Sequence, residues 1–306
     1  MKYDLIIIGV GPAGYSASIY ASRYKTNHII IGEIPGGLAT IAHKVCNYPS
    51  EIEISGVDLM EKMKKNVEHY NTEIINNKVV NIEKKEDLFK IKTQDKKEYE
   101  AKTILLAIGT KHRKLGLKNE SQFVGRGVSY CATCDAMFYK DKTVVVVGGG
   151  NSAMTASLYL ADVAKKVYQI YRGEVLKGEK MWQDQILKNE KIEVIYNTNI
   201  DEISGEKKVQ AIKLDKEYNN SKELDVDGIF IEIGSEPDYG LIEQLNVETD
   251  ENGFIKVKPN QSTNIEGVYA AGDITNGSDN FRQIITACSE GSIAANSIYK
   301  YLQSKK

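Results

Sequence analysis

The chain has 306 residues, of which 42% are hydrophobic and 27% charged, a balance typical of a folded globular protein that excludes a disordered or fibrous one. Forty basic residues against 42 acidic ones give a net charge of −2, so the chain lacks the positive field that nucleic-acid binding needs. A mean hydropathy of −0.36 and the absence of a long apolar run exclude a transmembrane helix. We therefore expect no nucleic-acid partner and no membrane-embedded segment.

The N-terminal sequence predicts where the protein resides. Residues 1–4 lead directly into a short apolar run, without the small-residue cleavage site of a signal peptide. We therefore expect the protein in the cytoplasm, where thiols are kept reduced.

The first predicted unit is a buried strand, a glycine turn and a helix. Leu5–Ile8 runs into Gly9-Val10-Gly11-Pro12-Ala13-Gly14 and then into small residues. The first glycine permits a tight turn, the second lets the backbone approach a pyrophosphate, and the third position must be small so that helix and strand pack closely. A second buried strand, 27–31, precedes Glu33, which lies 19 residues after Gly14, where an acid can bind a ribose. The unit therefore predicts a dinucleotide-binding site.

A cysteine pair and a second glycine turn follow. Of the four cysteines, only those of Cys131-Ala132-Thr133-Cys134 lie close together, and such a C-x-x-C indicates a redox or metal site. Val144–Val147 then runs into Gly148-Gly149-Gly150-Asn151-Ser152-Ala153, which repeats the first unit at a constant offset of 139. In this copy the turn either binds a nucleotide or only shapes the backbone.

The remaining segments complete an alternation of strands and helices. Residues 57–70 are amphipathic and, like 181–190, predict a helix, whereas 72–110 alternate as in a small antiparallel sheet that ends in a buried strand, 103–110. Strands are expected within 192–233 and at 267–273, and a last helix over 283–302. The pattern predicts an α/β fold of two Rossmann-like, three-layer dinucleotide-binding domains. The second is inserted into the first, because the first unit can share a sheet with the last strand and helix.

These motifs resemble a known family. The two glycine turns, the run Cys131-Ala132-Thr133-Cys134-Asp135 and the run Ala270-Ala271-Gly272-Asp273 lie in the order and spacing of the low-molecular-weight thioredoxin reductases. The resemblance covers essentially the whole chain. It implies a discontinuous FAD-binding domain, 1–113 and 243–306, and an inserted pyridine-nucleotide-type domain, 114–242, that carries the cysteine pair. It also implies a homodimer that reduces thioredoxin.

The resemblance assigns the FAD site to several separate segments. The glycine turn faces the pyrophosphate, the loop at 36–38 and Asn47 lie on the flavin side, Asp273 bonds the ribityl chain, and residues 282–284 meet the flavin edge. The implied FAD-binding residues are Gly9, Gly11, Pro12, Ala13, Gly14, Glu33, Gly36, Gly37, Leu38, Asn47, Val79, Gly109, Gly272, Asp273, Arg282, Gln283 and Ile284.

The resemblance also assigns roles to the redox residues. Cys134 lies against the flavin and receives its electrons, Cys131 attacks the disulfide of thioredoxin, and Asp135 shuttles a proton. This chemistry suits the residues, because disulfide reduction consumes protons and an attacking thiol must be partly thiolate. The alternative is half of a zinc site, which needs four ligands. Cys46 and Cys288 are isolated and the four histidines form no ligand spacing, so we expect no metal.

A departure from the family pattern concerns the electron donor. NADPH-using members carry a His-Arg-Arg-x-x-x-Arg motif whose arginines clamp the 2′-phosphate. The aligned run here is Tyr171-Arg172-Gly173-Glu174-Val175-Leu176-Lys177, which keeps only Arg172. Because a charged hydrogen bond contributes roughly 1.5–3 kcal/mol and lysine does not match the geometry of arginine, NADPH binding is doubtful. The chain resembles the ferredoxin-dependent flavin thioredoxin reductases in this respect. We therefore favour reduced ferredoxin as the donor, ahead of NADPH and then NADH.

Two other functions stay open. One is a flavin reductase with a regulatory C-x-x-C, in which blocking Cys131 leaves the activity intact. The other is a non-catalytic FAD-binding redox sensor, which would show no turnover with any electron donor.

Overall fold

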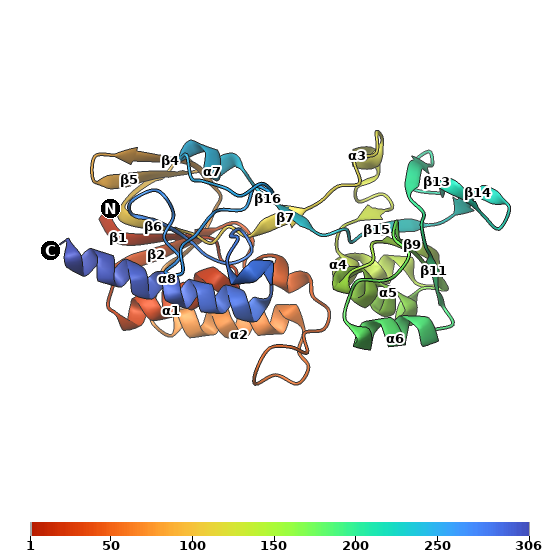
Figure 1. Cartoon of the computed structure of the whole chain (residues 1–306), viewed down its shortest axis with the longest axis horizontal. Helices are drawn as coiled ribbons and strands as arrows, with labels where there is room; N and C mark the ends of the chain where they lie inside the picture. The colour runs from red at the N-terminus through yellow and green to blue at the C-terminus, as the bar shows by residue number, and fades with distance from the viewer. Residues whose placement is uncertain (1, 306) are drawn as a thin grey trace. The chain divides into compact units, whose positions relative to one another are not determined.

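The chain forms two compact units (Figure 1). The computed structural model describes residues 2–305, apart from the side chain of Asn280. The first unit comprises the residues up to Lys111 and those from Glu236 on, and the second comprises His112–Ser235. The resemblance implies boundaries after residues 113 and 242 instead.

A seven-stranded sheet forms the centre of the first unit. Its strands follow the order β3-β2-β1-β6-β5-β4, and β17 pairs with β6. The antiparallel strands expected within 72–110 form, as β4, β5 and the first part of β6. They extend the main sheet, because β5 pairs with residues 98–101 of β6 and β17 with residues 104–106. The strands are β1 (Lys2–Ile8), β2 (His28–Gly32), β3 (Ile74–Asn76), β4 (Val79–Lys85), β5 (Leu88–Thr93), β6 (Glu98–Leu106) and β17 (Val268–Ala270).

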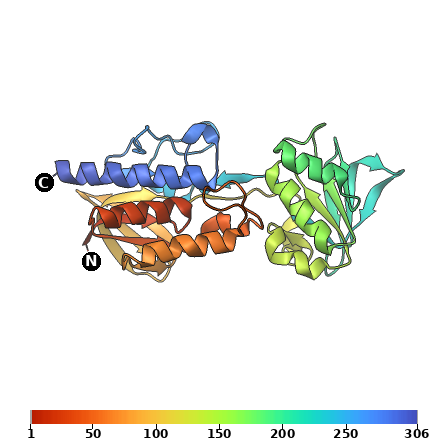
Figure 2. The ribbon, with the colours of Figure 1, turned by 90° about the horizontal axis from the view of Figure 1, so that it is seen from below.

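Both faces of this sheet are covered because its central strands are apolar on both sides. In β1, Leu5 and Ile7 pack into one core and Ile6 and Ile8 into the other. The first core lies under α1 (Pro12–Arg23), α2 (Gly56–Glu68) and α8 (Ile284–Ser304), whose ribbons run alongside one another in Figure 2. The second core includes residues of β4, β5 and α7 (Gly240–Gln244). Short 3₁₀ turns, η1 (Gly37–Ile41) and η3 (Ser278–Asn280), lie in the loops.

The second unit repeats this plan with a parallel sheet of order β11-β10-β9-β15-β8. One face packs against α4 (Ala132–Asp135), η2 (Ala136–Tyr139), α5 (Asn151–Val163) and α6 (Lys180–Lys188). The other packs against α3 (Glu120–Phe123) and a second sheet of β12 (Ile200–Ser204), β13 (Ala211–Tyr218) and β14 (Ser221–Asp225). The parallel strands are β8 (Val128–Ser129), β9 (Thr143–Val147), β10 (Lys166–Ile170), β11 (Ile192–Ile195) and β15 (Gly228–Ile231).

The chain passes between the units along two short paired strands, β7 (Thr110–His112) and β16 (Ser235–Pro237). No helix within residues 2–305 is both long enough and apolar enough to cross a membrane. The predicted fold class is confirmed: the protein is α/β, with two Rossmann-like units of which the second is inserted into the first.

Candidate cofactor cradle and redox disulfide

The first glycine turn lies between β1 and α1. Gly9 has a φ of +121°, and a Cβ there would lie 2.0 Å from the carbonyl oxygen of Ala107, so no other residue fits. Gly14 makes an equally close approach, 2.0 Å, to the carbonyl oxygen of Gly9. By contrast, a Cβ on Gly11 would meet only the Gly36 carbonyl oxygen, at 3.9 Å. Gly9 therefore lets the turn pack against the residue that follows β6, and Gly14 lets α1 pack against the turn, while the space above Gly11 is bordered only by the Gly36 carbonyl.

The space above Gly11 adjoins the N-terminus of α1. Gly11 is the N-cap of this twelve-residue helix, and no described side chain caps it. The first N–H groups of a helix have no partner within the helix, and they attract phosphate. The loop of Gly36 lies beside the turn, because the Gly36 N–H donates to the Val10 carbonyl at 2.8 Å. A Cβ on Gly37 would lie 3.5 Å from Gly11 Cα, so the structure brings these two predicted segments together.

Asp273 follows β17 on a loop that packs against the start of α1. A Cβ on Gly272 would lie 3.0 Å from Ala13 Cβ. Burial raises the pKa of Asp273 to about 6; Arg282 opposes this shift and Glu290 adds to it. The Arg282 Nε donates to the Asp273 carbonyl at 3.2 Å, and its guanidinium lies 3.6 Å from the ring centre of Phe254.

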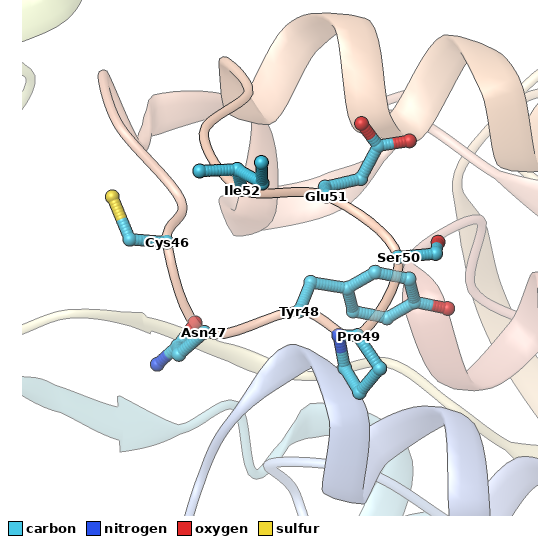
Figure 3. A pocket seen from close by; sticks show the side chains of 7 residues that line it. All are labelled: Cys46, Asn47, Tyr48, Pro49, Ser50, Glu51 and Ile52. Carbon is cyan, nitrogen blue, oxygen red and sulfur yellow. The ribbon is translucent and has the colours of Figure 1, made fainter.

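Asn47 and Gln283, which are both predicted to lie near the flavin, contact each other. The Asn47 side-chain amide donates to Gln283 Oε1 at 3.0 Å. Gln283 is also the N-cap of α8, which begins at Ile284, and it forms a capping box with Thr286. The loop 46–52 lines a pocket of about 450 Å³, and Figure 3 shows its seven side chains around the curve of the loop.

The other predicted FAD residues occupy varied positions. Glu33 follows β2, is exposed and lies 3.8 Å from Lys78 Nζ. Val79 is 6% exposed and its side chain packs into the second core, which leaves only its backbone to contact a ligand. Gly109 has a φ of +62°, and a Cβ there would have no atom within 4 Å, while Leu38 lies in η1. The open turn, the uncapped helix and the partly buried Asp273 together fit a dinucleotide with a polyhydroxyl chain, as FAD has.

The redox pair lies in the second unit. Cys131 and Cys134 are joined by a disulfide. Cys131 is the N-cap of α4, half-buried, and its Sγ accepts the Cys134 N–H at 3.1 Å, whereas Cys134 is exposed. Asp135, half-buried, ends α4, and its N–H donates to the Cys131 carbonyl at 3.3 Å. The structure therefore places all three predicted redox residues on one turn.

A buried acid that the sequence did not reveal supports this turn. Glu120 is 3% exposed, and its carboxylate accepts a hydrogen bond from the Tyr130 hydroxyl, next to Cys131. It also accepts the backbone N–H groups of residues 115, 116 and 117. Burial, followed by the hydrogen bond to Glu120, raises the pKa of Tyr130. No sequence motif marks Glu120, because its partners are set by the fold.

The second glycine turn is partly covered by the residues that replace the arginine motif. A Cβ on Gly149 would lie 2.5 Å from ring atoms of Tyr171, and one on Gly173 would lie 2.7 Å from the same ring. The Lys177 N–H donates to the Gly149 carbonyl at 2.8 Å. Arg172 and Glu174 are exposed.

A second missed acid borders this turn. The Glu232 N–H, directly after β15, donates to the Val147 carbonyl, and a Cβ on Gly148 would lie 2.1 Å from the Glu232 carbonyl oxygen. Burial raises the pKa of the Glu232 carboxyl to about 8. Within residues 2–305, no cluster of three or more His, Cys, Asp or Glu side chains could hold a metal ion.

The two glycine turns and the disulfide define a flavoprotein-like disulfide oxidoreductase, and comparisons with known proteins agree. Residues 3–291 match the family model described as pyridine nucleotide-disulphide oxidoreductase. A thioredoxin reductase of Peptoclostridium acidaminophilum is 38% identical over 310 aligned positions, which cover 98% of this chain and 97% of that protein.

Solved structures extend the likeness. The thioredoxin reductase of Lactococcus lactis superposes with a TM-score of 0.93 at 35% identity, with 99% of both chains covered. A ferredoxin-flavin thioredoxin reductase from Clostridium acetobutylicum is also 35% identical, with a TM-score of 0.54 and 99% of both chains covered. The chain therefore belongs to the pyridine nucleotide-disulphide oxidoreductases and, within them, to the thioredoxin reductase family.

Proposed function

We propose that the protein is a flavin-dependent thioredoxin reductase that passes two electrons to thioredoxin through Cys131 and Cys134. The observation that carries this proposal is the disulfide on the exposed turn of the second unit, in a chain whose first unit has an open dinucleotide cradle. FAD would be held by the turn at 9–14, the loop at 36–38, Asp273 and the start of α8. When bound, FAD supplies electrons to the disulfide in pairs, whether its donor gives one or two at a time.

The chain's own residues suit thiol–disulfide exchange. We assign the electron-accepting sulfur to Cys134 and the attack on the thioredoxin disulfide to Cys131. The Cys134 N–H that donates to Cys131 Sγ binds a thiolate more strongly than a neutral sulfur, and so supports the nucleophile. Asp135, one residue further, is the group we assign to proton transfer, because a reduced dithiol carries protons that a disulfide does not.

Reduced ferredoxin is the donor we favour. Tyr171 and Gly173 stand where NADPH-using relatives carry His and Arg, and the Tyr171 ring lies against Gly149 of the turn itself. The reduction potential of plant-type ferredoxins is about −400 mV and that of thioredoxin about −270 mV. Transfer of two electrons from ferredoxin to thioredoxin is therefore favourable by roughly 6 kcal/mol. A ferredoxin-flavin thioredoxin reductase is among the structural relatives.

NADPH is the second candidate donor. It is favoured by Gly150, which has no atom within 4 Å of a Cβ position, so the middle of the second turn is open. We further propose that the protein is cytoplasmic and forms a homodimer. Size-exclusion chromatography with light scattering tests the dimer.

The dithiol mechanism is tested by Cys134→Ser and Cys131→Ser. Each variant should retain FAD and lose thioredoxin reduction by at least a thousandfold. Full activity in either C-x-x-C variant would contradict the dithiol route and favour a flavin reductase.

A further inference from the structure

Glu290 is a buried carboxylate in the middle of α8 that the proposed chemistry does not use. Its residue is 4% exposed, and glutamates are almost never buried so deeply unless they are paired. Its Oε2 accepts the Gly272 N–H at 2.8 Å and the Thr275 hydroxyl at 3.0 Å. Its Oε1 accepts the Ser278 hydroxyl at 2.6 Å. Both carboxylate oxygens therefore accept hydrogen bonds, and the three donors belong to one loop.

That loop, 271–282, carries Asp273 and Arg282 from the end of β17 to the start of α8. Its backbone is irregular: Gly272, Ser278 and Asp279 have left-handed φ values of +82°, +50° and +51°. Such values are costly for residues other than glycine and persist only where neighbouring groups hold them. A Cβ on Gly277 would lie 2.6 Å from Glu290 Oε1, so the loop closes tightly over the carboxylate.

The bonds to Glu290 bracket Asp273. Gly272 precedes Asp273 and Thr275 follows it by two residues, and both bond to the same carboxylate oxygen. On the other side, Arg282 holds the Asp273 carbonyl and packs on Phe254. Asp273 is thus fixed from inside the core and from the surface.

We propose that Glu290 is a positioning residue for the flavin cofactor. The Glu290 carboxylate fixes residues 272–278 and so holds Asp273 where the ribityl chain binds. This inference rests on FAD binding by the first unit. Without the carboxylate, the three donors lose their acceptor and the loop samples other conformations, so FAD binding must first order it.

The test compares Glu290→Met with Glu290→Gln in the full-length protein, each stripped of FAD and titrated with it. FAD fluorescence quenching gives the dissociation constant, and visible circular dichroism reports the environment of the bound flavin. The Met variant keeps length and volume but no acceptor, so FAD should bind at least tenfold more weakly, with an altered dichroism. The Gln variant should bind within threefold of the wild type, because its amide oxygen still accepts from Gly272 and Thr275 and its NH₂ can donate to Ser278.

Wild-type affinity and dichroism in the Met variant would overturn the proposal, as would equal losses in the Met and Gln variants. If the Met variant does not fold, Thr275→Val decides. It removes both the donor to Glu290 and the acceptor of the Gly277 N–H at nearly constant volume, so FAD should bind at least fivefold more weakly. An unchanged constant and spectrum would overturn the proposal. A wild-type protein that binds no FAD would instead contradict the proposed function itself.

Discussion

The side-chain amide of Asn47 donates a hydrogen bond to Oε1 of Gln283 at 3.0 Å, and so joins two loops that lie 236 residues apart. Gln283 also caps α8, so the position of the loop 46–52 is linked to the start of the last helix. Both residues are implied FAD contacts, and the bond gives their segments a common support.

A double-mutant cycle tests this link. Asn47→Ala should lower the free energy of unfolding of the FAD-loaded protein by about 0.5–1.5 kcal/mol, because a net hydrogen bond is lost. In the Gln283→Ala background the same change should cost close to nothing, since the acceptor is already gone. Urea unfolding followed by flavin fluorescence measures all four proteins. Strictly additive losses would show that the bond carries no energy.

The Glu120–Tyr130 bond next to the redox pair predicts a stability effect. Tyr130→Phe removes one donor from a buried carboxylate and should cost about 1–3 kcal/mol in urea unfolding. Tyr218→Phe is the matched control, because the Tyr218 hydroxyl also donates to a carboxylate, that of Glu193, which lies nearer the surface. Its cost should be smaller, at about 1 kcal/mol or less. Equal costs would contradict a special role for burial at Glu120.

The features that could be predicted from the sequence are the local ones. The strand–turn–helix repeat, the C-x-x-C and the buried strands depend on neighbouring residues, and the structure has them. The attachment of β4 and β5 to the main sheet was missed, because β6 changes partners halfway along its length and no pattern in 98–106 marks the change.

The buried acids could not be predicted from the sequence either. A glutamate is usually exposed to solvent, and the donors that surround Glu120 and Glu290 come together only in the folded chain. An acid among the small and apolar residues of 287–295 was a readable signal for Glu290.

Glu232 predicts a dependence of stability on pH. Burial raises the pKa of its carboxyl from 4.5 to about 8, so between these values the folded state keeps a proton that the unfolded state releases. Stability should therefore fall as pH rises through this range, by up to about 1.4 kcal/mol per pH unit. The Glu232→Gln variant cannot ionise at this position, so its stability should fall less as pH rises. Urea unfolding of both proteins at pH 5, 6.5 and 8 measures the difference, and parallel profiles would refute it.

Restoring the arginine motif should create affinity for the 2′-phosphate. The variant Tyr171→His, Gly173→Arg, Lys177→Arg adds two guanidinium groups, each contributing roughly 1.5–3 kcal/mol to a charged hydrogen bond. NADPH should bind at least tenfold more tightly than to the wild type. NADH, which lacks the 2′-phosphate, is the internal control and should gain little. A matching gain for NADH would show that removal of the Tyr171 ring, and not phosphate recognition, is responsible.

An anaerobic titration distinguishes the two proposed electron donors, ferredoxin and NADPH. The FAD-loaded protein is mixed in turn with reduced ferredoxin and with micromolar NADPH, while flavin absorbance and thioredoxin thiols are followed. We expect reduced ferredoxin to drive thioredoxin reduction, and NADPH to bleach the flavin slowly or not at all. Fast bleaching by micromolar NADPH, with thioredoxin reduced at the same rate, would contradict this expectation.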